Sequence, residues 1–221
     1  MTKKIVAPAE TENNDLITSG LNSLIKWSKK HKQGLWTALI ILVVAGVIGY
    51  AYCAHQKSVT EKSWAAYYNA QIALATQGQE AGFKNLDDLS AQFKGTPAAQ
   101  YAQLLKGDIL YANENFAQAA DVYAPLTNSS NETVRTVATL SQAAAAQAAQ
   151  DYQRSIDLMK TFIQNNPNSF ALAQAYLTLA ISQELAGDKT AALETYKHIL
   201  EAYTKTYFGT FAKEKLTQLN K

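Results

Sequence analysis

The sequence has one cysteine, three histidines and four prolines in 221 residues, and each scarcity excludes something. A single cysteine cannot form an internal disulfide, so an oxidising compartment is neither supported nor contradicted. His31, His55 and His198 lie far apart in the sequence and form no cluster. The chain has no H-E-x-x-H, no glycine-rich phosphate loop and no G-x-S-x-G. Metal, nucleotide and covalent catalysis therefore lack their residues, and we expect no enzyme activity, no cofactor and no metal site.

Charged residues are also few, at 17% of the chain. Residues 55–221 hold fourteen Lys or Arg against fifteen acids, and no basic stripe with interleaved aromatic residues is visible. We therefore expect no nucleic-acid partner. Asp87 and Asp88 form the only adjacent acid pair, and neighbours in a helix do not face each other, so this pair indicates a solvated surface. Few glycines and prolines, with many alanines, favour helix.

The longest uncharged stretch runs from Gly34 to Ala54 (GLWTALIILVVAGVIGYAYCA). As a helix it would reach about 30 Å, the thickness of a bilayer's hydrocarbon core. Its leucines, isoleucines and valines together favour membrane insertion by about 3 to 5 kcal/mol. We expect residues 34–54 to form one transmembrane helix. A buried core helix is the alternative, although such a helix usually carries a polar stripe.

Charge on either side of this stretch predicts its orientation. Four lysines precede it closely and only two cations follow nearby, these being Lys26, Lys29, Lys30 and Lys32 before it and Lys57 and Lys62 after it. The basic side stays in the cytoplasm. We therefore expect a single-pass protein of the bacterial inner membrane, with residues 1–33 cytoplasmic and residues 55–221 periplasmic. A cleaved signal peptide is the competing interpretation, but no A-x-A site follows.

Residues 1–14 are polar and aperiodic, and we expect them to be disordered. From Asp15 apolar residues fall near helical spacing, which predicts a short amphipathic helix on the inner leaflet, with a solvated linker as the alternative. Within the span, Ala45, Gly49 and Cys53 recur every four residues. A second membrane helix could approach closely at such a small-residue face. The alternative is that these residues have no partner, since small residues are common in membrane helices.

Beyond the span the chain reads as helical hairpins. We expect helices over residues 58–77 and 83–93, followed by three similar hairpins. Their second helices begin near Phe116, Tyr152 and Lys189, spaced by 36 and 37 residues. This is close to the tetratricopeptide period of about 34. The fold prediction is all-α: one transmembrane helix, then a tetratricopeptide-like solenoid of about four hairpins, closed by a capping helix that contains Phe211 and Ala212.

Without catalytic residues, protein binding is the remaining function. The first helices of such hairpins line a concave surface. We predict that this surface is mostly apolar and slightly acidic, unless the first hairpin or the capping helix covers it. The predicted groove residues are Tyr101, Leu104, Asp108, Tyr111, Val137, Leu140, Leu177, Ile181 and Glu184.

The order of segments resembles the YfgM family. The resemblance rests on the basic amino-terminal segment, the span, Gly49-Tyr50-Ala51-Tyr52, the aromatic helix that contains Trp64 and Tyr67, and Phe93-Lys94-Gly95-Thr96-Pro97 before degenerate repeats. It implies an ancillary subunit of the SecYEG translocon that pairs with a PpiD-like membrane chaperone and assists exported client proteins in the periplasm. The alternatives are a scaffold in bacterial envelope or outer-membrane assembly and a regulator of an envelope-stress response.

Overall fold

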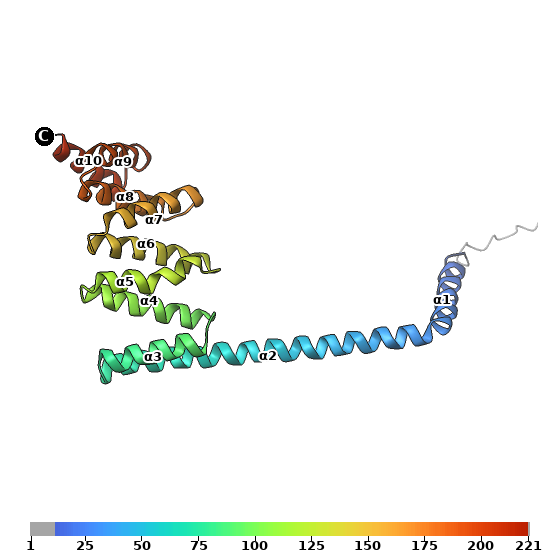
Figure 1. The fold of residues 1–221 in the computed structure, drawn as a ribbon. Coiled ribbons are helices and arrows are strands. Elements are labelled where there is room, and N and C mark those ends of the chain that lie inside the picture. Colours follow the sequence, from blue (N-terminus) through green and yellow to red (C-terminus); the bar gives the residue numbers. More distant parts are fainter. Residues whose placement is uncertain (1–11, 221) are drawn as a thin grey trace, which may run out of the picture. The chain divides into compact units, whose positions relative to one another are not determined.

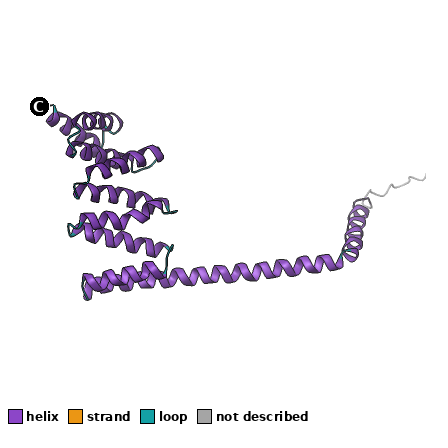
Figure 2. Ribbon diagram, in the orientation of Figure 1, coloured by secondary structure: helices purple, strands orange, loops and turns teal. Residues whose placement is uncertain are grey.

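The computed structural model describes residues 12–220, and their side chains from Thr18 onward. The chain divides into two compact units, residues 1–58 and 59–221. Throughout the described residues the regular structure is helical (Figure 2). The helices are α1 (Glu12–Lys30), α2 (Lys32–Thr76), α3 (Gln79–Gln92), α4 (Pro97–Ala112), α5 (Phe116–Tyr123), the 3-10 helix η1 (Ala124–Asn128), α6 (Glu132–Ala148), α7 (Tyr152–Asn165), α8 (Leu172–Leu185), α9 (Lys189–Ala202) and α10 (Tyr207–Leu219).

The first unit contains α1 and the amino-terminal part of α2. Helix α1 begins at Glu12, three residues before the expected start, and the predicted disorder of residues 1–11 lies outside the described residues. Helix α2 is long and apolar enough to cross a membrane. Its apolar side chains are open, with Leu42 71% and Ile48 64% exposed. The buried core helix considered above is therefore wrong for this stretch.

The expected helix over residues 58–77 is not a separate element. The structure continues α2 without a break to Thr76, because no glycine or proline lies between Gly49 and Gly78. Within the second unit, the last turns of α2 pack with α3 and α4. Ala70 on α2, Leu86 and Leu89 on α3, and Ala102 on α4 form one buried cluster.

Four helical hairpins follow one another in the second unit (Figure 1). Helices α2 and α3, α4 and α5, α6 and α7, and α8 and α9 make the pairs, and α10 packs on α9. The second helices of the last three pairs begin at Phe116, Tyr152 and Lys189, which the repeat spacing had aligned. Helix α10 buries Ala212 completely. The predicted solenoid with a capping helix is confirmed.

Three of these hairpins turn in the same way. The second residue after the first helix is left-handed in each, with φ of 62° at Glu114, 63° at Gln150 and 83° at Gly187. In each, the amide of the next residue bonds a carbonyl five residues back, as Asn115 N does to Leu110 O at 2.9 Å. This is a Schellman ending, in which glycine is the preferred left-handed residue. Two of the three repeats therefore carry backbone strain at this position.

Glycine at these positions should stabilise the array. We expect Glu114→Gly and Gln150→Gly each to raise the free energy of unfolding by about 0.5 to 1 kcal/mol, because glycine adopts positive φ without a Cβ clash. Urea denaturation of the full chain in mild detergent, followed by circular dichroism, measures this. Gly187→Glu is the reciprocal control and should destabilise. A loss of stability in both glycine variants would contradict the strain argument.

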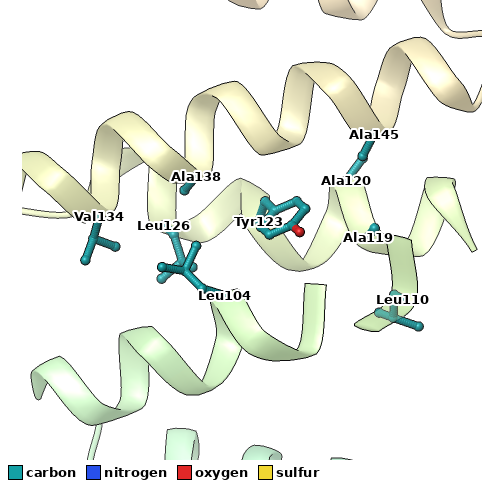
Figure 3. Close-up of a cluster of buried hydrophobic side chains, with 9 residues drawn as sticks. All are labelled: Leu104, Leu110, Ala119, Ala120, Tyr123, Leu126, Val134, Ala138 and Ala145. Carbon is teal, nitrogen blue, oxygen red and sulfur yellow. The ribbon is translucent and has the colours of Figure 1, made fainter. Parts of the chain in front are cut away.

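Small residues set the spacing between helices. In the cluster of Figure 3, Tyr123 of α5 lies between α4 and α6, and Ala138 and Ala145 of α6 are fully buried. Ala143, two residues before Ala145, belongs to the next cluster with Met159. The alanine-rich run of α6 therefore contacts helices on two sides, which bulkier side chains would prevent.

The α6–α7 hairpin, the middle one of the three repeats, has Ser155 where the other two have Ala119 and Ala192. Ser155 of α7 is completely buried, and the Ser182 hydroxyl of α8 donates a hydrogen bond to it at 2.9 Å. Gln147 Nε2 of α6 in turn donates to the Ser182 hydroxyl at 3.1 Å. Each buried polar group has a partner, so the substitution replaces a methyl contact with a hydrogen-bonded link across three helices.

Candidate protein-binding surface

A hollow of about 270 Å³ lies between the first helices of two consecutive hairpins, with one wall from α2. Tyr101 and Val137 stand at its rim, each 40% exposed, and Leu104 forms its floor, only 8% exposed. We call it the aromatic hollow, and its lining residues are Tyr67, Tyr101, Leu104, Leu105, Asp108, Thr133, Val134 and Val137. One carboxylate among apolar and hydroxyl groups makes it apolar and slightly acidic.

Aromatic rings from α2 extend this wall. The Trp64 ring lies 5.8 Å from the Tyr101 ring and 5.6 Å from the Tyr67 ring, the latter edge to face. Tyr68 continues the row and is 59% exposed. Such rings offer large contact area with little conformational entropy to lose on binding. The predicted groove did not include Tyr67, although Trp64, Tyr67 and Tyr68 lie three and four residues apart in the sequence, a signal for one helix face.

A second hollow, of about 310 Å³, shares Asp108 with the first and is lined by Tyr111, Tyr123, Ser141 and Ala144. Asp108 accepts a hydrogen bond from the Tyr123 hydroxyl at 2.5 Å while its side chain remains exposed. Burial, together with this bond to a carboxylate, raises the pKa of Tyr123 far above its usual value of 10. Asp108 thus anchors the hairpin core and also presents negative charge at the surface.

In the last hairpin a buried tyrosine also bonds to a carboxylate, but the carboxylate lies one turn further along the first helix. Ile181 occupies the position that Asp108 has in the first repeat, so the Tyr196 hydroxyl donates instead to Glu184 at 2.7 Å. Burial and this bond raise the pKa of Tyr196 far above 10. Glu184 also pairs with Lys215 of α10 at 2.8 Å. The negative charge of Glu184 is therefore paired with a cation of the array itself.

These two tyrosines predict a stability loss at alkaline pH. The folded state holds their pKa above the unfolded value of about 10, so their contribution is complete below pH 10 and falls as pH rises. Above pH 10 each should cost up to about 1.4 kcal/mol of unfolding free energy per pH unit. Urea denaturation at a series of pH values between 8 and 12 measures how the free energy of unfolding changes with pH. The double variant Tyr123→Phe/Tyr196→Phe should remove most of this slope, leaving the part due to Tyr67 and Tyr203, whose pKa burial also raises. An unchanged slope would contradict the assignment.

The predicted groove residues divide into two groups. Tyr101, Leu104, Asp108, Tyr111 and Val137 line the two adjoining hollows. The other four pack elsewhere: Leu177 is 6% exposed, Leu140 and Ile181 lie against core clusters, and Glu184 is paired with Lys215. The open part of the predicted surface is therefore on α4 and α6. As a binding site it stays a prediction.

The small-residue face of α2 is open in the first unit. Ala45, Gly49 and Cys53 are all exposed, and no side chain comes within 4 Å of a Cβ placed on Gly49. Cys53 is a free thiol. Helix contact at this face also stays a prediction. Among residues 12–220, no group of three or more His, Cys, Asp or Glu side chains could hold a metal ion.

A larger hollow of about 750 Å³ lies between η1, α6 and α7, and the sequence interpretation missed it. Helix α5 has only eight residues, against fourteen in α7, because Pro125 ends it and η1 follows. The charged groups here already have partners. Arg135 Nη1 donates to Ser129 O at 2.9 Å, and Arg154 pairs with Asp121 at 3.3 Å. The aromatic hollow is smaller, but exposed aromatic side chains gather beside it, which makes it the better candidate for binding an apolar segment.

Comparison with known proteins agrees with this architecture. Residues 26–221 match a family described as tetratricopeptide repeat-like domain. The TPR-like repeats of a kinesin light chain from Podospora anserina are similar in structure, with a TM-score of 0.54, 13% identity, and coverage of 72% of this chain and 86% of that one. A MamA RS-1 double mutant has a TM-score of 0.51 at 13% identity and covers 72% of this chain and 94% of that one. At this identity the likeness shows the fold alone. No curated protein matches the chain.

Proposed function

Because the chain belongs to the tetratricopeptide repeat-like domain family, whose members generally mediate protein–protein interactions, we propose that it is a membrane-anchored adaptor that binds partner proteins. The observation that carries the proposal is the aromatic hollow with the adjoining Asp108 surface. Exposed Tyr101, Tyr111 and Val137 gather there on α4 and α6. This arrangement suits an extended or helical apolar segment of a partner.

The anchor is the amino-terminal part of α2. Its uncharged stretch is long enough to span a bilayer, and its residues are all exposed. The lysines before it favour a cytoplasmic amino terminus. We therefore place residues 34–54 in a bacterial inner membrane, residues 1–33 in the cytoplasm and the array in the periplasm.

The proposed partners come from the resemblance to the YfgM family. We propose that the array works beside the SecYEG translocon with a PpiD-like membrane chaperone, and that it holds exported client segments as they emerge. Protein binding without catalysis is sufficient for this role. The absence of H-E-x-x-H, phosphate-loop and G-x-S-x-G motifs from the sequence supports it.

A fusion reporter tests the anchor and its orientation. An alkaline phosphatase, which is active only in the periplasm, should be active when fused after Lys221, because the positive side of the span stays inside. A cytoplasm-active reporter at the same position is the matched control and should be inactive. The opposite pattern would reverse the topology and would contradict a periplasmic adaptor.

Partner identity has a separate test. Affinity purification of the full chain in mild detergent should recover translocon and chaperone subunits. Tyr101→Asp/Val137→Asp should reduce bound client segments at least about tenfold, since charge replaces apolar contact at the rim. Phe170→Asp is the matched control, because Phe170 is 81% exposed and lies outside both hollows. Recovery of outer-membrane or cell-wall machinery instead would favour the scaffold alternative.

A further inference from the structure

The junction of α1 and α2 forms a hollow of about 390 Å³ inside the first unit. Only His31 separates the two helices, and backbone hydrogen bonds run through it, from His31 N to Trp27 O at 3.0 Å and from Leu35 N to His31 O at 2.9 Å. The hollow therefore lies beside a short, hydrogen-bonded turn. Its lining residues are Ser28 and Lys29 from α1 and Lys32, Leu35, Trp36 and Leu39 from α2.

The lining is basic near the junction of the two helices and apolar further along α2. Lys29 and Lys32 stand at one end with the Ser28 hydroxyl, and no acidic side chain is among the lining residues. Leu35 and Trp36 follow one turn on, and Leu39 lies about 10 Å beyond Lys32 along the helix axis. The side chains of Trp36 and Leu39 are 58% and 50% exposed. Two positive charges thus precede an open apolar surface that continues into the proposed span.

We propose that this hollow binds an anionic phospholipid of the surrounding bilayer. The phosphate lies between Lys29 and Lys32, and the first part of an acyl chain follows Leu35 and Leu39. The ligand needs both a negative headgroup and an apolar tail to match both ends of the lining. A free phosphate ion would leave the apolar end unmatched. Trp36 falls near the amino-terminal end of the proposed span, residues 34–54, and tryptophan favours the membrane interface.

This inference rests on the proposed insertion of α2 into a membrane, and it goes beyond that proposal in assigning a selective lipid site. If the basic residues were attracted only in a general way to an anionic surface, every nearby lysine would contribute equally to the preference for anionic lipid. Lys26 and Lys30 lie on α1, as Lys29 does, but do not line the hollow. They provide a matched pair with the same charge at positions where a defined site does not need it.

Tryptophan quenching by brominated lipids tests the site. In the full chain, Trp27→Phe and Trp64→Phe leave Trp36 as the single reporter. The protein is reconstituted into vesicles of phosphatidylcholine and phosphatidylglycerol at fixed proportions, with bromine placed on one lipid or the other. We expect the anionic lipid to associate with the Trp36 site at least about fivefold more strongly than the zwitterionic one.

The lysine variants separate a site from a charged surface. Lys29→Gln/Lys32→Gln should abolish the preference for the anionic lipid, whereas Lys26→Gln/Lys30→Gln should retain most of it. Equal losses in both pairs, or equal quenching by both lipids in the parent protein, would overturn the site. Millimolar inorganic phosphate at constant ionic strength should not reduce the preference, and its loss there would overturn the lipid assignment. If neither brominated lipid quenches Trp36, the span itself is outside the bilayer and the membrane anchor fails.

Discussion

Replacing Gly107 by valine is expected to lower the free energy of unfolding of the array by about 3 kcal/mol or more, because α4 and α5 could no longer approach. A Cβ at Gly107 would lie 2.5 Å from Cε1 of Tyr123. The tyrosine ring cannot move aside easily, since it is 2% exposed and its hydroxyl is bonded to Asp108. Urea denaturation of the full chain in mild detergent, followed by circular dichroism, measures the loss.

Two comparisons isolate this contact. Gly46→Val adds the same side chain where a Cβ meets nothing within 4 Å, and it should leave unfolding of the array unchanged. Tyr123→Leu makes room at the contact, so Gly107→Ala should cost less in that background than alone, by about 1 kcal/mol. Equal costs in both backgrounds would show that ring contact is not the reason for glycine at this position.

Met159→Ala should have a comparable effect, a loss of about 2 to 5 kcal/mol. Met159 is completely buried in the middle hairpin, where it packs with Ile156, Phe162 and Leu179. It stands 36 residues after Tyr123 and 37 before Tyr196, so it fills the position that tyrosine fills in the other two repeats. Truncation would leave a cavity between three helices, and the same denaturation experiment measures its cost.

The conservative control is Met159→Leu, which keeps the volume and should cost less than about 1.5 kcal/mol. Unlike Tyr123, Met159 has no hydroxyl and needs no hydrogen-bond acceptor. Accordingly, Ala144 stands at the repeat position where the first repeat has the acceptor Asp108. A loss below about 1 kcal/mol for Met159→Ala would mean that the neighbouring helices collapse into the space. In that case the packing of the middle hairpin would be more easily deformed than that of the other repeats.

The sequence predicted the repeat architecture well, because its signal is local. Phe116, Tyr152 and Lys189 align by spacing alone, and each begins a helix in the structure. Hydrophobic length alone also identified the apolar stretch of α2. The left-handed residues Glu114 and Gln150 had no such signal, since neither is the glycine that normally marks a helix end.

The site was harder to predict because repeat position does not determine exposure. Asp108 and Ile181 are equivalent in the repeat, yet Asp108 is exposed and lines both hollows while Ile181 packs against the α8–α9–α10 cluster. Which repeat remains open depends on packing between distant helices. The contribution of Tyr67 required knowledge that α2 lies beside α4, as the contact between Trp64 and Tyr101 shows.

Asp108 illustrates how one residue serves both structure and surface. It accepts the Tyr123 hydroxyl, and it also joins the two hollows that present Tyr101 and Tyr111. Glu184 is the corresponding acceptor for Tyr196, but Lys215 neutralises it. The amino-terminal half of the array therefore keeps an unpaired negative charge among exposed aromatic rings, which favours partner segments that combine apolar and basic residues.

Site-specific photocrosslinking in intact cells tests the central claim most directly. A photoreactive amino acid is placed at Tyr101 in the aromatic hollow, or at Phe170, which is more exposed but lies outside it. We predict discrete crosslinked partner proteins from position 101 and none of them from position 170. Partners captured equally from both positions, or only from position 170, would contradict protein binding by the face that α4 and α6 form.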